Sequence, residues 1–369
     1  MSFLRCKPSI FVIGQDYEFI LNVKNNGLCF IEVGEEFYYE ENSGVLPSER
    51  TVLKIRVPQS VLDKAKRYSI VFRETKERQS YYSTFKPLCV ETFDFKPLEK
   101  KEDIHIYHIA DVHYRFEEAK EMATFFGEDV DLFVVNGDIG EVESEENFFE
   151  VCAFTGEISQ GKIPMIFVRG NHDTRGRLAE LYPKYFPVQD KKTYYTFEIG
   201  CLNGVVLDCG EDKVDVNVQY DASEDTPEKY RGINRFHSYR QKELKFLKEV
   251  ELQTENKISF AISHICPNEP GPIFNIEGEC YSAWNEELER MGIKFMLCGH
   301  DHKAFVLLQG DERNLIDHTY PVIVGSACSD KGLLGAAITL NKTEMTVCFT
   351  NSACEIVEKY SLLLTDKNN

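Results

Sequence analysis

The chain has 369 residues, and its 42 lysines and arginines against 61 aspartates and glutamates give a formal net charge of −19. This length favours two domains over a single core. So acidic a chain is poorly suited to hold nucleic acid or an anionic membrane by general electrostatics, which argues against both partners. No stretch reaches the roughly 20 apolar residues of a membrane span, and the first eight residues lack the apolar core of a signal peptide.

The twelve cysteines are scattered along the chain and include no Cys-x-x-Cys pair. This pattern predicts neither a zinc knuckle nor a disulfide framework. Since no export signal is found, reduced thiols are expected, and we predict a cytoplasmic protein.

Residues 1–98 predict a small all-β domain. Apolar and polar residues alternate from Tyr17 to Val23 and again from Leu53 to Val57, as in half-buried strands,. Further short strands are expected at 28–33, 68–73 and 79–85, and such spacing is typical of a sandwich of the immunoglobulin or fibronectin kind. No catalytic pattern stands out here, so we interpret this domain as a packing or docking module.

A charged, proline-containing stretch at 96–103 marks the expected domain boundary,. Beyond it, strands alternate with helices, which predicts an α/β domain over 104–369. Strands are expected at 104–109, 132–135, 165–168, 258–263 and 295–298, and helices at 117–126, 145–159 and 238–250. The polar segment 209–237 lacks periodicity and is interpreted as a lid or binding loop.

Metal-binding residue types follow the ends of five predicted strands. In chain order the segments are Asp111-Val112-His113, Gly137-Asp138, Gly170-Asn171-His172-Asp173, Ser263-His264 and Gly299-His300-Asp301-His302. Functional groups of α/β sheets gather where strands end and loops begin. We therefore expect these five ends to converge on one site.

The residue types fit a pair of cations. Two ions roughly 3.5–4 Å apart can clamp a phosphoryl group and supply hydroxide near neutral pH. Ions that close need a bridging carboxylate, for which Asp138 is the best choice. Imidazoles and an amide oxygen fill other positions without excess negative charge, and such mixed ligands favour manganese, iron, cobalt, nickel or zinc over calcium.

Each fragment alone has a simpler explanation. An Asp-x-His at a strand end is usually a helix cap or surface turn, a Gly-Asp is usually a turn, and Ser263-His264 alone is typical of a core histidine. The two longer segments are more specific, because each stacks several ligand types within four residues. Five of the nine histidines fall in these segments, and this joint pattern favours a metal site.

The five segments, in this order, resemble the motifs of the calcineurin-like metallophosphoesterase superfamily over about residues 104–349. The resemblance implies a four-layer α-β-β-α sandwich that holds a dinuclear metal centre. It implies that His172 lies beside the substrate as general acid and that Asp173 orients it. One metal would be held by Asp111, His113, Asp138 and His302, and the second by Asp138, Asn171, His264 and His300.

A β-sandwich placed before such a domain is similar to the arrangement of purple acid phosphatases. Those enzymes carry a tyrosine ligand to ferric iron three residues after the bridging aspartate, whereas this chain has Glu141 there. We therefore expect two divalent ions, with manganese, iron or zinc favoured, and neither a tyrosinate–iron colour nor an acid optimum.

Two arginines are candidates for substrate contacts. Arg175 lies just after the central motif, and Arg235 lies in the polar segment. Either could grip a second phosphate or a carboxylate, as arginine does in a bidentate geometry. The alternative, that both are solvated surface charges, stays open.

The resemblance implies a phosphatase or phosphodiesterase that hydrolyses small phosphate esters by in-line attack of a metal-bound hydroxide. One alternative is a nuclease acting on DNA or RNA, which would need a basic track that the acidic composition does not favour. Another is a non-catalytic interaction module on a phosphoesterase fold, although every expected ligand position is occupied here. The choice between monoesters and diesters, and the oligomeric state, stay open.

Overall fold

The computed structural model describes residues 2–40, 50–99, 102–212, 235–268, 278–329 and 332–364. The protein has the predicted mixed α/β class, with 20 strands in the described part of the chain. The first eight strands are β1 (Ser9–Ile13), β2 (Asp16–Asn22), β3 (Gly27–Val33), β4 (Glu36–Tyr39), β5 (Val52–Pro58), β6 (Arg67–Arg78), β7 (Ser83–Phe85) and β8 (Cys89–Asp94). The others are β9 (Ile104–Ile109), β10 (Leu132–Asn136), β11 (Met165–Val168), β12 (Tyr195–Ile199), β13 (Leu202–Val206), β14 (Ile258–Ile262), β15 (Phe295–Cys298), β16 (Lys303–Leu307), β17 (Val322–Ser329), β18 (Gly332–Leu340), β19 (Glu344–Thr350) and β20 (Ile356–Leu363).

The α-helices are α1 (Gln59–Ala65), α2 (Phe116–Ala123), α3 (Glu145–Ser159), α4 (Tyr182–Tyr185), α5 (His237–Glu249) and α6 (Gly278–Arg290). Short 3-10 helices are η1 (Gly127–Asp129), η2 (His172–Thr174) and η3 (Ala179–Leu181). Helix α3 has the predicted bounds, and its first turn is closed by a capping box in which the Ser144 side chain accepts a hydrogen bond from Asn147 N,. Helix α1 was not predicted; it follows Pro58 and buries Leu62.

Two runs of parallel strands position the motif segments. Strands β9, β10 and β11 pair in parallel, and so do β13, β14 and β15. One continuous network, in the order β12-β13-β14-β15-β17-β18-β9-β10-β11-β1-β2-β5, includes both runs. Because the carboxyl ends of parallel strands meet at one edge, each run brings its motif segments together.

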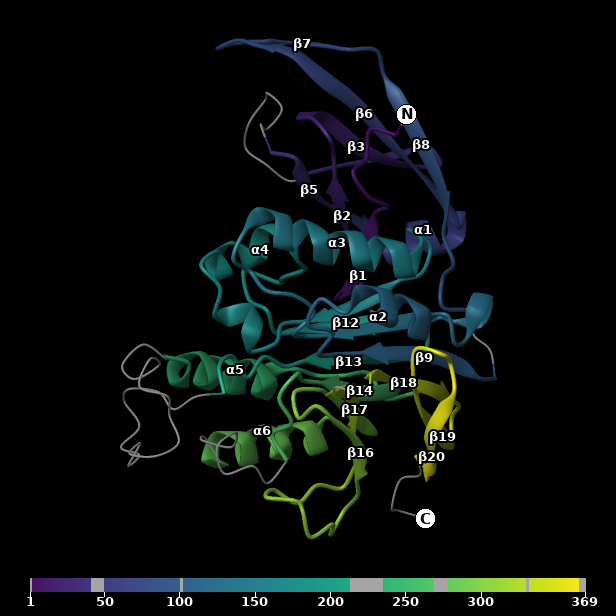
Figure 1. Ribbon diagram of the computed structural model, residues 1–369, viewed down its shortest axis with the longest axis vertical. Helices are drawn as coiled ribbons and strands as arrows, with labels where there is room; N and C mark the ends of the chain where they lie inside the picture. The colour runs from purple at the N-terminus through teal and green to yellow at the C-terminus, as the bar shows by residue number, and fades with distance from the viewer. Residues whose placement is uncertain are drawn as a thin grey trace.

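The sheet network is covered by helices (Figure 1). Helices α2 and α3 share a hydrophobic cluster with one face of β10, including Met122, Phe148 and Phe133. Helices α5 and α6 share another with β15, including Trp284 and Met296. A third and larger cluster joins the inward-facing residues of both parallel runs to the N-terminal strands.

The N-terminal strands divide between two sheets. Strand β1 pairs in parallel with β11, with Phe11 opposite Met165, and β2 and β5 follow it outward. The remaining strands form a separate sheet in the order β4-β3-β6-β7, with β8 beside β6. The first segment is therefore rich in strands, as expected, but part of it extends the sheet of residues 104–369. The domain boundary after residue 98 stays a prediction.

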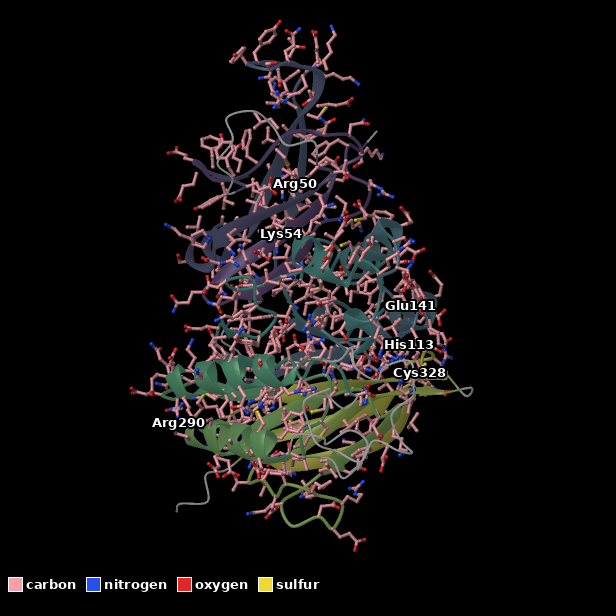
Figure 2. The ribbon with its side chains drawn as sticks, turned by 90° about the vertical axis from the view of Figure 1, so that its left-hand side faces the viewer. Arg50, Lys54, His113, Glu141, Arg290 and Cys328 are labelled. Atoms are coloured by element: carbon pink, nitrogen blue, oxygen red, sulfur yellow. The ribbon has the colours of Figure 1, made fainter. Side chains whose placement is uncertain are left out.

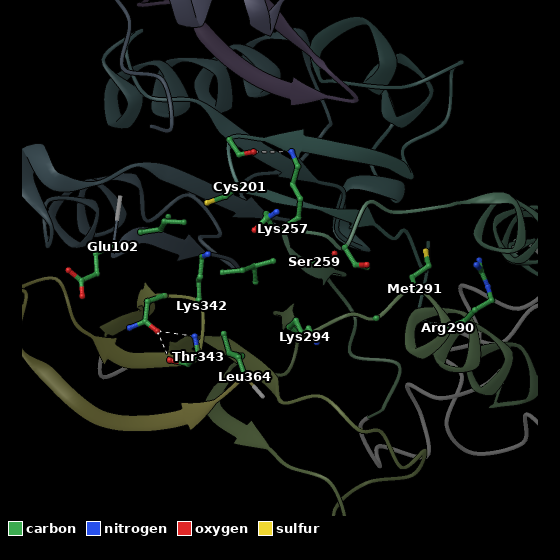
Figure 3. A pocket seen from close by; sticks show the side chains of 17 residues that line it. Glu102, Cys201, Lys257, Ser259, Arg290, Met291, Lys294, Lys342, Thr343 and Leu364 are labelled. Atoms are coloured by element: carbon green, nitrogen blue, oxygen red, sulfur yellow. Dashed lines mark hydrogen bonds between the residues drawn. The ribbon is translucent and has the colours of Figure 1, made fainter. Parts of the chain in front are cut away.

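A groove of about 1160 Å³ lies at the amino ends of the strands, where Ile104 and Ile258 begin β9 and β14 (Figure 3). Two of its cations contact carboxylates of the protein itself: Lys257 Nζ lies 2.8 Å from Glu198 Oε1, and Arg290 Nε lies 2.5 Å from Glu287 Oε2. The motif segments stand at the opposite ends of these strands.

No described helix has the length and apolar character needed to cross a membrane.

Candidate metal centre

The structure brings the predicted ligands together in two groups. Asp111, His113 and His302 form one, and Asp138, His264 and His300 form the other. Within each group the possible ligand atoms all lie within 4.8 Å of one another. The first group stands at the edge of the molecule where Figure 2 labels His113 and Glu141.

The first group is held by short contacts between potential ligand atoms. His302 Nε2 lies 3.4 Å from Asp111 Oδ1, and His113 Nε2 lies 3.2 Å from His302 Nε2. His113 Nε2 is 3.9 Å from the same Asp111 oxygen. Two imidazole nitrogens and one carboxylate oxygen thus point at a common position, as the ligands of one ion would.

The second group adds the amide of Asn171. Its Oδ1 lies 3.0 Å from His300 Nδ1, and His264 Nε2 lies 3.3 Å from Asp138 Oδ2. The same amide oxygen faces Asp138 Oδ2 at 3.2 Å and His264 Nε2 at 3.3 Å. Oxygens and nitrogens that carry lone pairs therefore converge here, and this donor set fits a divalent cation of the manganese, iron or zinc type.

The electrostatics of the centre favour a positive charge. The side chains of Asp111 and Asp138 are buried, with 0% and 1% exposure. Burial alone would lower the pKa of His264, but the carboxylates of Asp138 and Asp111 raise it to about 10. By contrast, burial lowers the pKa of His300 to about 4, which keeps this ring in the neutral form that ligates metals,.

The backbone of the centre is strained in a way that sequence patterns do not reveal. Five of the seven predicted metal ligands have positive φ, between 44° and 71°: Asp111, His113, Asp138, His300 and His302. Non-glycine residues rarely adopt this conformation, and such residues cluster at functional sites. Glycine is required beside them, because a Cβ on Gly170 would lie 2.1 Å from Asp138 Oδ1.

A buried polar chain fixes the orientation of His264. Its Nδ1 lies 2.7 Å from the carbonyl oxygen of Asn136, which leaves Nε2 to face Asp138. The Asn136 amide nitrogen in turn lies 3.0 Å from His108 Nε2. Burial lowers the pKa of His108 to about 3, so this ring is neutral and can accept that hydrogen bond. Outer contacts of this kind orient the histidine ligands of metals.

His172 and Asp173 lie at the centre but do different things. His172 N donates a hydrogen bond to Asp138 Oδ1 at 2.9 Å, and its Nε2 lies 3.1 Å from a guanidinium nitrogen of Arg175. Burial lowers the pKa of His172. Asp173 accepts from Gly170 N at 2.7 Å, and burial together with Asp138 raises its pKa to about 7. The Asp173 carboxylate contacts Gly170 N and Asp138 N, and the His172 ring contacts Arg175; the orienting role of Asp173 stays a prediction.

The two arginines have different surroundings. Arg175 bonds to both carboxylate oxygens of Glu211 at 2.6 Å and to Asp212 Oδ1 at 2.7 Å. Arg235 is exposed and does not line the pocket at the ligands. That pocket, of about 330 Å³, is lined by Asp138, Asn171, His172, Arg175, Asp212, His300, Asp301 and His302.

Sequence patterns missed Glu211 and Asp212. Both residues follow β13, which pairs in parallel with β14, so the carboxyl ends of these two strands lie at the same edge of the sheet. Their position after a predicted strand is the signal that could have identified them. They begin the polar segment that was interpreted as a lid. Most of that segment, 213–234, lies outside the described residues.

Comparisons with known proteins agree with this geometry. The family model for calcineurin-like phosphoesterases matches residues 104–304, more than half of the chain. The fold is similar to that of purple acid phosphatase PPD1 from yellow lupin, with a TM-score of 0.62 and 9% identity over 96% of this chain and 73% of that one. It is also similar to PhoD, with a TM-score of 0.55 and 10% identity over 98% of this chain and 90% of that one.

No curated protein matches the chain in sequence. The two structural likenesses, at this low identity, concern the fold alone, and they agree with the expected likeness to purple acid phosphatases. The residues matched by the family model include all five motif segments, from Asp111 to His302. The chain belongs to the calcineurin-like phosphoesterase family and is a hydrolase of phosphate esters.

Proposed function

We propose that the protein hydrolyses small phosphate esters with the help of two divalent ions. The observation that carries this proposal is the adjacency of the two ligand groups. His264 Nε2 lies 3.3 Å from Asp138 Oδ2 of its own group and 3.7 Å from Asp111 Oδ1 of the other. Ions held by the two groups would be neighbours, and the buried carboxylate of Asp138 could bridge them.

The ligand sets follow from the groups. When bound, the ions would supply a nucleophilic water at neutral pH and would neutralise charge on the phosphoryl oxygens. One ion would be held by Asp111, His113, Asp138 and His302, and the other by Asp138, Asn171, His264 and His300.

We assign His172 the role of general acid, which protonates the leaving group. This side chain lines the pocket beside the ligands. Arg175 Nη1 lies 3.1 Å from its Nε2. To act as general acid the ring would first take up a proton and, as imidazolium, give it to the leaving oxygen, returning to the neutral form. Asp173 supports this arrangement indirectly, because it holds Gly170 N and thereby the turn that carries His172.

A small substrate fits better than nucleic acid. The pocket of about 330 Å³ takes a phosphate and a small substituent. Arg175 is the one lysine or arginine among its described lining residues, and two carboxylates already engage it. A nuclease would need a basic track for the phosphate backbone. A non-catalytic role fits less well, since every expected ligand position is filled.

We also propose a reducing, cytoplasmic compartment, because all twelve cysteines are free thiols,.

The function is tested with p-nitrophenyl phosphate and bis-p-nitrophenyl phosphate, given to metal-stripped protein with and without manganese, iron or zinc. We expect turnover only with added metal, and the preferred ester identifies the substrate class. No turnover of either ester with any of the three metals would contradict the proposal.

A further inference from the structure

The turn after β13 reaches the metal centre from a segment outside the five motifs. Asp212 Oδ2 lies 3.5 Å from His300 Nε2. The other nitrogen of the same ring, Nδ1, faces Asn171 Oδ1 at 3.0 Å. The two ring nitrogens of His300 thus have separate neighbours: Nδ1 points at the second ligand group, and Nε2 points at a carboxylate.

The same turn also holds the arginine that contacts His172. The Arg175 guanidinium is gripped on one edge by Glu211, at 2.6 Å to each oxygen, and its Nη2 also lies 2.7 Å from Asp212 Oδ1. Its remaining nitrogen, Nη1, lies 3.1 Å from His172 Nε2. Asp212 therefore uses one oxygen for the arginine and the other for His300.

The turn itself is rigidly held from behind. Arg240 on α5 is fully buried, and its guanidinium donates to the carbonyl oxygens of Cys209 at 2.8 Å and Glu211 at 2.6 Å. Gly210 has a φ of +69°, and a Cβ there would lie 2.3 Å from the Phe236 ring. The carboxylates of Glu211 and Asp212 are 2% and 3% exposed. Buried, charge-assisted hydrogen bonds of this kind fix side-chain orientation.

We propose that Asp212 and Arg175 are positioning residues, and this inference rests on the proposed function. The Asp212 carboxylate faces His300 Nε2 at 3.5 Å and, through its negative charge, favours the tautomer with the hydrogen on Nε2, which leaves Nδ1 for the second ion. Arg175, clamped by Glu211 and Asp212, donates to His172 Nε2 and fixes that ring at the pocket. The turn 208–212 is thereby a sixth segment of the site, and Arg175 acts on His172 and not as a substrate anchor.

The first test counts ions and measures their affinities in wild-type protein and in Asp212→Asn and Asp212→Ala, by equilibrium dialysis against manganese. Loss of an outer contact typically weakens metal binding about 10–100-fold. We expect this loss only at the second ion, the one assigned to His300, and a larger loss for alanine than for asparagine. The affinity of the first ion should not change. The matched control is Asp129→Asn, an exposed acid on η1 before the amino end of β10, which should change neither affinity.

Equal affinities in wild type and Asp212→Ala would overturn the inference. Equal weakening of both ions would also overturn it, because that would indicate a general loss of structure. If wild-type protein bound no manganese, the proposed function itself would fail, so the two failures are distinguishable.

The second test separates positioning from substrate binding at Arg175. For Arg175→Gln with p-nitrophenyl phosphate, we expect kcat to fall at least about 10-fold while KM changes less than about twofold, as for an interaction that matters only in the transition state. Arg175→Lys should recover little, because a single ammonium cannot span Glu211, Asp212 and His172 together. A raised KM with unchanged kcat would identify a substrate anchor and overturn this half of the inference.

Discussion

His264 Nε2 lies 3.3 Å from Asp138 Oδ2, and this contact joins strands that are far apart in the sheet order. Asp138 follows β10 and His264 follows β14, with β15, β17, β18 and β9 between them in the network. The contact exists because the network folds over a shared apolar core that includes Val134 of β10 and Ile262 of β14. The metal centre therefore forms where the carboxyl ends of two parallel runs face each other.

His172→Ala tests the assignment of the general acid. A positioned acid contributes about 10²–10⁴-fold, and its help matters most when the leaving group is basic. We expect kcat to fall by this order for an alkyl phosphate and by clearly less for p-nitrophenyl phosphate. Equal losses for both esters, or none for the alkyl phosphate, would contradict the assignment.

Glu243 on α5 offers a test of buried charge away from the ligands. Its Oε1 accepts a hydrogen bond from Asp208 N at 2.9 Å, and burial, with the nearby Asp208 carboxylate, raises its pKa well above the usual value. The folded state therefore holds this proton more tightly than the unfolded state. Stability from this group is present below the unfolded pKa of about 4.3 and is lost as pH rises toward the folded pKa.

Glu243→Gln removes that pH dependence, because glutamine mimics the protonated acid. Relative to wild type, the variant should gain unfolding free energy as pH rises from 5 to 8, by at most about 1.4 kcal/mol per pH unit. Urea unfolding at several pH values measures this difference. A difference that stays constant, or that shrinks as pH rises, would mean that Glu243 is ionised in the folded protein.

The residue at position 141 predicts the colour of an iron-loaded form. Glu141 stands where purple acid phosphatases carry their tyrosine ligand, and its backbone N–H donates to the Tyr114 hydroxyl at 2.9 Å. Protein loaded with ferric iron should show no tyrosinate charge-transfer band in visible absorption. A purple protein would mean that Tyr114, the residue directly after His113, is recruited as a ligand.

Much of the centre was predictable because its ligands sit at strand ends. The strands before Asp111, Asp138 and Asn171 are short apolar runs, and parallel pairing brings their carboxyl ends together without any further information. Spacing and residue type then suffice to suggest a metal. The two ligand groups contain all six of the predicted carboxylate and histidine ligands.

Other features depend on contacts that local patterns do not encode. The pairing of β1 with β11 joins residues about 150 positions apart in sequence, so a strand-rich segment was predicted without its partner. Asp212 stands in a segment with no hydrophobic periodicity, and its role depends on a buried turn, held by Arg240 of α5, that only the folded chain creates. Asp138 and His300 have positive φ, a conformation that contacts in the folded protein impose against the local preference of these residue types,.

The most direct test of the account counts metal ions in wild-type protein and in Asp138→Asn after dialysis against manganese, and measures turnover of the same samples. The buried carboxylate of Asp138 is the proposed bridge, so wild type should bind two ions per chain and hydrolyse the ester. The variant should bind fewer than two and lose at least about 100-fold in kcat, the order expected when transition-state charge stabilisation is removed. Wild-type protein that binds no ion, or a variant that keeps both ions and full turnover, would contradict the dinuclear centre.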